Sequence, residues 1–142
     1  MFRDILLPID LAEKSSWRKS LPLAIEYAEQ FGTKLHFLSV LPDFRMPLVA
    51  QYFPKNFEDK TSADMHNRLQ AFVRKRVPQG VEVGHVVVAV GCAYEKILEA
   101  AKDIKADLIV MASHRPANRD FLLGSNADRV VRHFKGSVLV VR

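Results

Sequence analysis

The sequence of 142 residues contains a single cysteine, Cys92, and no long hydrophobic run. One cysteine cannot form an intramolecular disulfide, which excludes the disulfide-rich secreted domains and favours a reducing compartment. No apolar stretch approaches the roughly 20 residues that a membrane-spanning helix needs. Residues 1–10 hold a short apolar run without a signal-peptide cleavage site, so they predict a first strand. We therefore expect one cytoplasmic globular domain, residues 1–142, that does not insert into membranes.

The motifs of several catalytic and ligand-binding classes are also missing. The chain has neither Gly-x-x-x-x-Gly-Lys-Ser/Thr nor Gly-x-Gly-x-x-Gly, which excludes the P-loop and the dinucleotide fingerprint. No Ser-His-Asp set and no close pair of carboxylates can be placed at one site, so we expect no catalytic residue. The histidines show no metal-ligand spacing with one another or with Cys92, so we expect no metal site. These histidines are His36, His66, His85, His114 and His133.

The formal net charge of +5 raises the question of nucleic acid as a partner. Only residues 74–76, Arg-Lys-Arg, form a basic run, and the other cations are scattered among carboxylates. Proteins that bind nucleic acid usually show a stripe of cations with interleaved aromatic residues, or a recognised module. Neither is present, so we expect no nucleic acid partner and interpret residues 74–76 as a solvated helix end. The positive bias would still attract a polyphosphate.

What the sequence does have is a regular alternation of apolar runs and amphipathic stretches. Several runs are nearly continuous, as expected for strands that are covered on both faces. The alternation predicts a single doubly wound α/β domain, in which a five-stranded parallel sheet with right-handed crossovers carries helices on both faces. The predicted strands are residues 5–9, 34–40, 81–90, 107–111 and 137–141, and the helical patterns span residues 21–31, 65–73, 97–104 and 127–134.

Proline, glycine and cysteine positions refine this outline. Pro22 leaves two alternatives for the first helix, a start near Ser20 with Pro22 in the first turn, or an earlier start kinked at Pro22. Gly32 and Gly136 are predicted helix stops. The connection 42–60 holds three prolines and four aromatic residues without a clean period, and either packs back on the domain or forms a lid. Cys92, before the third helix, is predicted to be a half-buried, unreactive thiol.

Candidate binding residues lie at the predicted carboxyl ends of strands, where open parallel sheets bind ligands. One set is Pro8, Ile9 and Asp10, another is Val40 with Leu41, and a third is residues 111–115. Gly124, Ser125 and Asn126 directly precede the last helical pattern. A helix start presents free N–H groups and a partial positive charge, so this segment either binds an anion or is an ordinary helix cap.

The whole chain resembles the universal stress protein family. Ile-Leu-Leu-Pro-Ile-Asp10 is similar to the family's first strand. Residues 91–111 are similar to the family's passage from the third strand through the third helix to the fourth strand. Residues 112–142 resemble the family's nucleotide loop, last helix and last strand. The ATP-binding members usually carry Gly-x-x-Gly, then nine residues, then Gly-Ser/Thr. Here Ala112 and Arg115 replace the first two glycines, and eight residues rather than nine separate Arg115 from Gly124. This variant is similar to that of a small single-domain bacterial subgroup.

The resemblance implies the sheet order 3-2-1-4-5 and an adenine nucleotide ligand, ATP with or without Mg²⁺, or else AMP or ADP. It places Pro8, Ile9 and Asp10 on the adenine or ribose side and Val40 along the base. The remaining implied nucleotide residues lie along the ribose and phosphates: Met111, Ala112, Ser113, His114, Arg115, Gly124, Ser125 and Asn126. For His114, contact with phosphate and a structural role both stay open, and the Arg115 guanidinium can supply the charge that two glycine N–H groups would otherwise provide.

These implications predict an ATP-binding protein of stress response and regulation without efficient turnover. Slow hydrolysis or autophosphorylation stays open, with Ser125 as a plausible acceptor. The alternative is a nucleotide-independent dimeric interaction module whose pocket is empty or binds another small ligand. An enzyme acting on another adenylated substrate would rest on likeness of fold alone. The apolar final strand, residues 137–142, predicts a homodimer through the sheet edge, and the regulatory protein partner is unknown.

Overall fold

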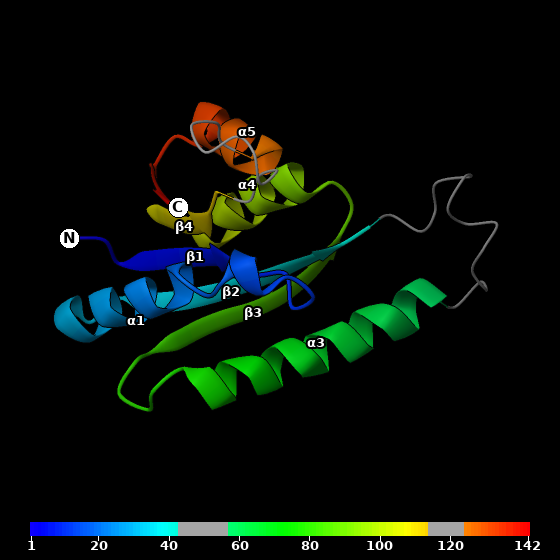
Figure 1. The fold of residues 1–142 in the computed structure, drawn as a ribbon, viewed down its shortest axis with the longest axis horizontal. Coiled ribbons are helices and arrows are strands. Elements are labelled where there is room, and N and C mark those ends of the chain that lie inside the picture. The colour runs from blue at the N-terminus through cyan, green and yellow to red at the C-terminus, as the bar shows by residue number, and fades with distance from the viewer. Residues whose placement is uncertain (43–56, 114–123) are drawn as a thin grey trace.

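The computed structural model describes residues 1–42, 57–113 and 124–142, with the side chains of the first long helix described from Lys60 onward. The chain forms a five-stranded parallel sheet in the order β3-β2-β1-β4-β5 (Figure 1). The predicted α/β class, sheet order and strand number are thus confirmed. The elements are β1 (Asp4–Pro8), the 3-10 turn η1 (Lys14–Ser16), α1 (Ser20–Phe31), β2 (Lys34–Leu41), α3 (Phe57–Arg76), β3 (Val83–Val90), α4 (Ala93–Ile104), β4 (Leu108–Ala112), α5 (Ser125–His133) and β5 (Ser137–Val141).

Helices cover both faces of the sheet, which explains the nearly continuous apolar strands. Successive residues of β1 point to opposite faces, so Ile5 and Leu7 pack under α1 and α3 while Leu6 packs under α4 and α5. All three side chains are fully buried. Figure 1 shows α1 and α3 on one side of the sheet and α4 and α5 on the other. The central strand β1 is therefore packed on both faces, and the ends of its neighbours β2 and β4 are positioned against it.

The first helix follows one of the two predicted alternatives. It begins at Ser20, so Pro22 lies in the first turn, where its missing N–H has no intrahelical partner to lose. It ends at Gly32, which adopts a left-handed φ of 66° and donates its N–H to the Ala28 carbonyl oxygen 2.8 Å away. A glycine takes this conformation without steric cost, and the predicted stop is confirmed.

Several boundaries differ from the prediction: α4 begins at Ala93 rather than at Ile97, β3 begins at Val83 rather than at Val81, and two further differences concern α3 and α5. The second helical pattern begins at Phe57 rather than near Met65, so the predicted connection 42–60 loses its last four residues to α3. Its residues 43–56 lie outside the described part of the chain, as does the choice between lid and packed loop. The last helix ends at His133 with Phe134 as its C-cap, two residues before the predicted stop at Gly136.

The prediction for Cys92 is wrong in one respect. Its residue is exposed rather than half-buried, and it is the N-cap of α4 without a side-chain cap hydrogen bond. The backbone there is extended, with φ −79° and ψ 127°, as is usual for an N-cap residue. Position next to a helix therefore does not bury this thiol.

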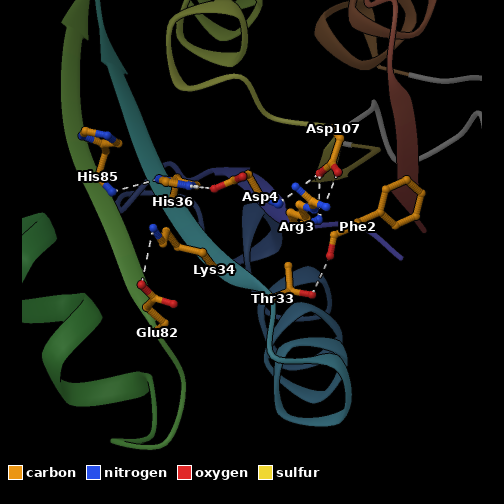
Figure 2. Close-up of polar contacts among 9 residues, drawn as sticks. All are labelled: Phe2, Arg3, Asp4, Thr33, Lys34, His36, Glu82, His85 and Asp107. Atoms are coloured by element: carbon orange, nitrogen blue, oxygen red, sulfur yellow. Dashed lines mark hydrogen bonds and ion pairs between the residues drawn. The ribbon is translucent and has the colours of Figure 1, made fainter.

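A bulge between β2 and β3 is closed by a histidine ring (Figure 2). Leu35 pairs with Val83 and Phe37 with Val86, so His36 lies opposite two residues, Gly84 and His85. The bulged His85 N–H donates to His36 Nδ1 over 2.9 Å, and His36 Nε2 lies 2.8 Å from Asp4 Oδ1. Because Nδ1 accepts, the ring proton is on Nε2 and is donated to Asp4. The neutral imidazole therefore links three strands.

Burial lowers the pKa of His36 below the ordinary histidine value of 6.5, and it outweighs the hydrogen bond and charge of Asp4, which raise it. The charges of Lys34 and His85 act in the same direction as burial. On α4, three further charged side chains line the groove beside His85, namely Lys96, Glu99 and Asp103. Protonation of Nδ1 would also place two N–H groups against each other, so the fold favours the neutral ring.

We expect the free energy of unfolding to fall as the pH is lowered below 6.5, because the unfolded chain takes up the His36 proton before the folded chain does. The contribution is complete above pH 6.5 and is lost as the pH falls through the lower folded-state pKa, by at most about 1.4 kcal/mol per pH unit. Urea unfolding at a series of pH values measures the slope. His36→Asn keeps an acceptor for the His85 N–H and should flatten the slope, whereas His133→Asn, at an exposed position, should not. Equal slopes in both variants would contradict the assignment.

Candidate functional site

A cavity of about 190 Å³ lies where the carboxyl ends of β1, β2 and β4 meet the starts of α4 and α5. β1 is the point at which the strand order reverses, since its neighbours are β2 on one side and β4 on the other. Open α/β sheets bind ligands at such a point. The lining residues are Pro8, Ile9, Asp10, Glu13, Ser16, Leu38, Val40, Ala93, Ile97, Met111, Ala112, Ser125, Asn126 and Ala127.

The end of β1 is held in place by its neighbour β2. The Ile9 N–H donates to the Leu38 carbonyl oxygen over 2.7 Å, and the buried Ser39 hydroxyl donates to the Ile9 carbonyl oxygen over 2.6 Å. Both Ile9 and Leu38 also line the cavity. These bonds satisfy the backbone of Ile9 just beyond the last residue of the strand, so this wall of the cavity is preformed.

The turn after β1 is closed by its own polar groups. The Asp10 carboxylate oxygen Oδ1 accepts from the Ala12 N–H at 3.0 Å, as in an Asx turn. The Ser16 hydroxyl accepts from the Asp10 N–H and donates to the Asp10 carbonyl oxygen, both at 2.9 Å. Asp10 therefore stabilises this turn, and the same turn brings Asp10, Glu13 and Ser16 to the cavity.

The start of α5 forms the opposite side of the cavity. Gly124 is the N-cap, with extended backbone and no side chain to cap the helix, and its carbonyl oxygen accepts from the Asp128 N–H at 2.9 Å. Ser125 and Asn126 are the first helical residues and not the cap, so the ordinary N-cap role predicted as an alternative for them is wrong. By helix geometry the N–H groups of this first turn have no intrahelical acceptor, and they carry the positive end of the helix dipole.

The chemical character of the cavity changes from one side to the other. Leu38, Val40, Ile97 and Met111 supply an apolar wall, whereas the N-terminal turn of α5 supplies donors. Such a mixture suits a ligand with a flat apolar part and an anionic part. Among the described residues, no three His, Cys, Asp or Glu side chains are grouped to hold a metal ion.

The structure brings together eight of the twelve residues predicted from the sequence. Those that line the cavity are Pro8, Ile9, Asp10, Val40, Met111, Ala112, Ser125 and Asn126. Ser113 and Gly124, the residues that flank segment 114–123, are buried and do not line the cavity. The Ser113 N–H donates to the Val141 carbonyl oxygen at 3.0 Å, which ties the end of β4 to β5. His114 and Arg115 lie outside the described residues.

Six lining residues were not predicted from the sequence: Glu13, Ser16, Leu38, Ala93, Ile97 and Ala127. The last four have the apolar spacing of ordinary core residues, and no local pattern separates a core position from a cavity wall. Glu13 and Ser16 could have been found, because Asp10 directly after an apolar strand is typical of an Asx turn, and the polar run 13–16 begins three residues later.

None of the helices in residues 1–42, 57–113 and 124–142 is long and apolar enough to cross a membrane.

The comparisons with known proteins concern the full length of the chain. The model of the universal stress protein family matches residues 1–142. Universal stress protein G of Escherichia coli O157:H7 is 31% identical over 150 residues, with 100% of both chains covered. Among solved structures, a universal stress protein in complex with cAMP has a TM-score of 0.68 at 24% identity, with 99% of this chain and 97% of that chain covered.

A further structural likeness is to the universal stress protein from Archaeoglobus fulgidus in complex with dAMP. Its TM-score is 0.62 at 19% identity, and the match covers 100% of this chain and 98% of that chain. The two likenesses to solved structures show the shared fold, and the match over residues 1–142 shows the family. The chain belongs to the universal stress protein family.

Proposed function

We propose that this protein binds an adenine nucleotide in the cavity between β1, β2, β4 and α5, with ATP as the preferred ligand, and acts in stress response without efficient turnover. The observation that carries the proposal is the convergence of an apolar wall and a free helix start on one preformed cavity. Each half alone is common in proteins. Together at the strand-order switch point they match the two parts of a nucleotide.

The lining indicates how the parts of the ligand would be distributed. The base would lie along Val40 and the neighbouring apolar wall, and the ribose hydroxyls would face Asp10. The phosphates would accept hydrogen bonds from the N-terminal turn of α5, with Ser125 beside them. The cavity volume of about 190 Å³ is below the roughly 300–1,000 Å³ of common ligand pockets. The phosphates would therefore extend beyond the cavity toward Gly124, the N-cap of α5. Bound Mg²⁺ would neutralise phosphate charge and be held mainly by phosphate oxygens.

Two relatives of the same fold support an adenine ligand, since their structures are complexes with cAMP and dAMP. Both ligands share the adenine base and a phosphate group with ATP. They differ from ATP in the number and linkage of the phosphates. AMP and ADP therefore remain competitors in any binding measurement.

The lining residues do not favour rapid hydrolysis. Asp10 and Glu13 are the acidic side chains at the cavity, and they lie on the turn that follows β1 rather than on the α5 side where the phosphates would sit. A general base must lie within hydrogen-bond reach of the attacking water. Ser125, exposed in the first turn of α5, is the hydroxyl best placed to accept a phosphoryl group in a slow autophosphorylation.

The direct test is to denature freshly purified protein and to identify the released small molecules by chromatography and mass spectrometry. We expect an adenine nucleotide in an amount that approaches one per chain. Release of a different ligand, or of none from protein that also fails to take up ATP, would favour the second candidate, a nucleotide-independent interaction module. That candidate is motivated by Ala112 and Arg115 at the positions of the usual glycines.

Arg115→Ala is expected to weaken ATP binding by roughly tenfold, because a charge-assisted hydrogen bond to phosphate contributes about 1.5–3 kcal/mol. Isothermal titration calorimetry with wild type and variant measures the change. Arg68→Ala, at an exposed arginine on α3, removes the same charge far from the cavity and should leave the affinity unchanged. Equal affinities of Arg115→Ala and wild type would show that the guanidinium has not replaced the glycine N–H groups.

We further propose a symmetric homodimer through β5, a sheet edge that pairs only with β4 among the described strands. The Ser137 N–H and the Val141 carbonyl oxygen both bond toward β4, so by alternation the backbone groups of Val138 and Val140 face outward. Val140→Pro removes one outward donor without breaking the β4 ladder. Light scattering should give a dimer for wild type at micromolar concentration and a monomer for Val140→Pro. A monomeric wild type would refute the proposal.

A further inference from the structure

A second groove, of about 860 Å³, runs along the exposed side of α1 to the C-terminal end of α3. It lies on the sheet face that α1 and α3 cover, and none of its lining residues lines the nucleotide cavity. We call it the α1–α3 groove and define it by its cations Lys14, Arg18, Lys75 and Arg76, its apolar floor Trp17, Pro22 and Ile25, and its carboxylates Glu26 and Glu29.

The cationic end of the groove joins two distant parts of the sequence. Lys14 and Arg18 precede α1, whereas Lys75 and Arg76 end α3. The basic run at residues 74–76 is exposed at a helix end, as expected from the sequence. Its last residue, Arg76, packs against Trp17, which lies ahead of α1. The Arg76 guanidinium carbon lies 4.3 Å from the centre of the Trp17 ring. The fold therefore concentrates four positive charges that are dispersed in the sequence.

Trp17 fixes this end of the groove. Its ring packs edge-on against Phe72, with ring centres 5.0 Å apart, and Arg76 lies over its face. The indole Nε1 is buried and has no hydrogen-bond partner among the described residues. A buried N–H without an acceptor is unusual, but it lies in the plane of the ring, whereas Arg76 lies over the ring face. An anionic ligand at this end of the groove would therefore meet the guanidinium and the neighbouring cations rather than the indole N–H.

The other end of the groove has the opposite charge. Pro22, Ile25 and Glu29 follow one another at spacings of three and four residues, which places them along one side of α1, and Arg18 lies just ahead of the helix, four residues before Pro22. Pro22 and Ile25 are apolar and at least partly exposed, and Glu29 lies about 10 Å beyond Pro22 along the helix axis. The groove therefore presents cations, then an apolar stretch, then carboxylates.

We propose that the α1–α3 groove binds an acidic amphipathic segment of a partner protein. Carboxylates of the segment would face Arg18 and Lys75, an apolar side chain would cover Pro22 and Ile25, and a basic or amide side chain would face Glu29. Charge complementarity in this order selects one binding direction as well as one class of ligand. The proposal does not depend on nucleotide binding.

The same features disfavour two other anionic partners. A nucleic acid strand carries phosphate at every step, and it would meet repulsion from Glu26 and Glu29 within the groove. The one indole that could stack on a base is already covered by Arg76 and Phe72. A membrane surface would need apolar side chains that project, whereas Pro22 and Ile25 lie in a groove.

The test uses a twelve-residue peptide with four glutamates, two central leucines and two terminal lysines, added to the full-length protein. Trp17 is the only tryptophan of the chain, so its emission reports on the cationic end, and anisotropy of a labelled peptide gives the affinity. We expect saturable binding that weakens with salt and is accompanied by a change in Trp17 emission. A peptide with glutamine in place of glutamate should bind at least about fivefold more weakly.

Matched charge reversals separate the groove from general electrostatics. Arg18→Glu and Lys75→Glu, both at exposed positions, should each weaken peptide binding by roughly five- to tenfold. Lys102→Glu changes the net charge equally on α4, across the sheet, and should have no effect. Lys14→Glu provides a third reversal if either variant is unstable. Equal weakening by Lys102→Glu, no binding of the peptide, or tighter binding of duplex DNA or phosphatidylserine vesicles through Arg18 and Lys75 would overturn the proposal.

Discussion

Ala93→Trp is expected to abolish the rise in melting temperature that the proposed ATP binding would cause in the wild-type protein. Ala93 is the first residue of α4, is partly exposed and lines the nucleotide cavity, so an indole at this position would occupy the space proposed for the ligand. ATP at 100 times its dissociation constant should stabilise the wild type by about 2.7 kcal/mol. For a domain of this size that corresponds to a shift of roughly 10 °C.

The variant itself should melt close to the wild type without nucleotide, because the new side chain enters open space rather than the core. Ala100→Trp provides the matched control, since Ala100 is also partly exposed on α4 but lines the separate groove beside His85. It should keep the full response to ATP. A normal ATP response in Ala93→Trp would place the nucleotide elsewhere on the protein.

Gly84→Ala is expected to lower the free energy of unfolding by about 2–4 kcal/mol. A Cβ at this position would overlap the Cε1 and Nδ1 atoms of the His36 ring. The ring cannot turn aside cheaply, because its side chain is 3% exposed and is bonded to Asp4 and to the His85 N–H. The cost combines overpacking of about 1–3 kcal/mol with the loss of a buried hydrogen bond. Urea unfolding measures the change.

Two comparisons identify the cause. Gly80→Ala should be nearly neutral, since a Cβ there would meet nothing within 4 Å. In a His36→Ala background, Gly84→Ala should cost less than about 1 kcal/mol, because the ring that it would overlap is gone. Additive effects of the two substitutions would instead indicate that the glycine is needed for backbone conformation alone.

The five strands and the end of α1 could be predicted from the sequence, whereas Gly136 did not mark the end of α5. Residues 137–141 were predicted as a strand and form β5 with the same limits, because Gly136 and Ser137 are followed by four valine or leucine residues. The end of α1 was predictable because Gly32 follows it, whereas Pro22 left two possible starts, of which the one at Ser20 is observed. The start of α3 was not, because residues 57–63 are mostly polar and carry no apolar period, although the chain there is helical.

The features that depend on contacts between residues far apart in the sequence could not be predicted. The His36 bridge requires the register of three strands and a bulge, and no local pattern in the sequence reports either. The α1–α3 groove likewise requires Arg76 to meet Trp17 across 59 positions. At the nucleotide cavity, the strand-end residues were found from the fold class and the family resemblance, whereas the walls from Leu38 and Ile97 look like core in the sequence.

The most direct test of the central claim is calorimetric titration of nucleotide-free wild-type protein with ATP in the presence of Mg²⁺. The account predicts one saturable binding event per chain, with competition by AMP or ADP and no binding in Ala93→Trp. An absence of saturable heat, together with an unchanged melting temperature in millimolar ATP, would contradict it and leave the cavity without a nucleotide role.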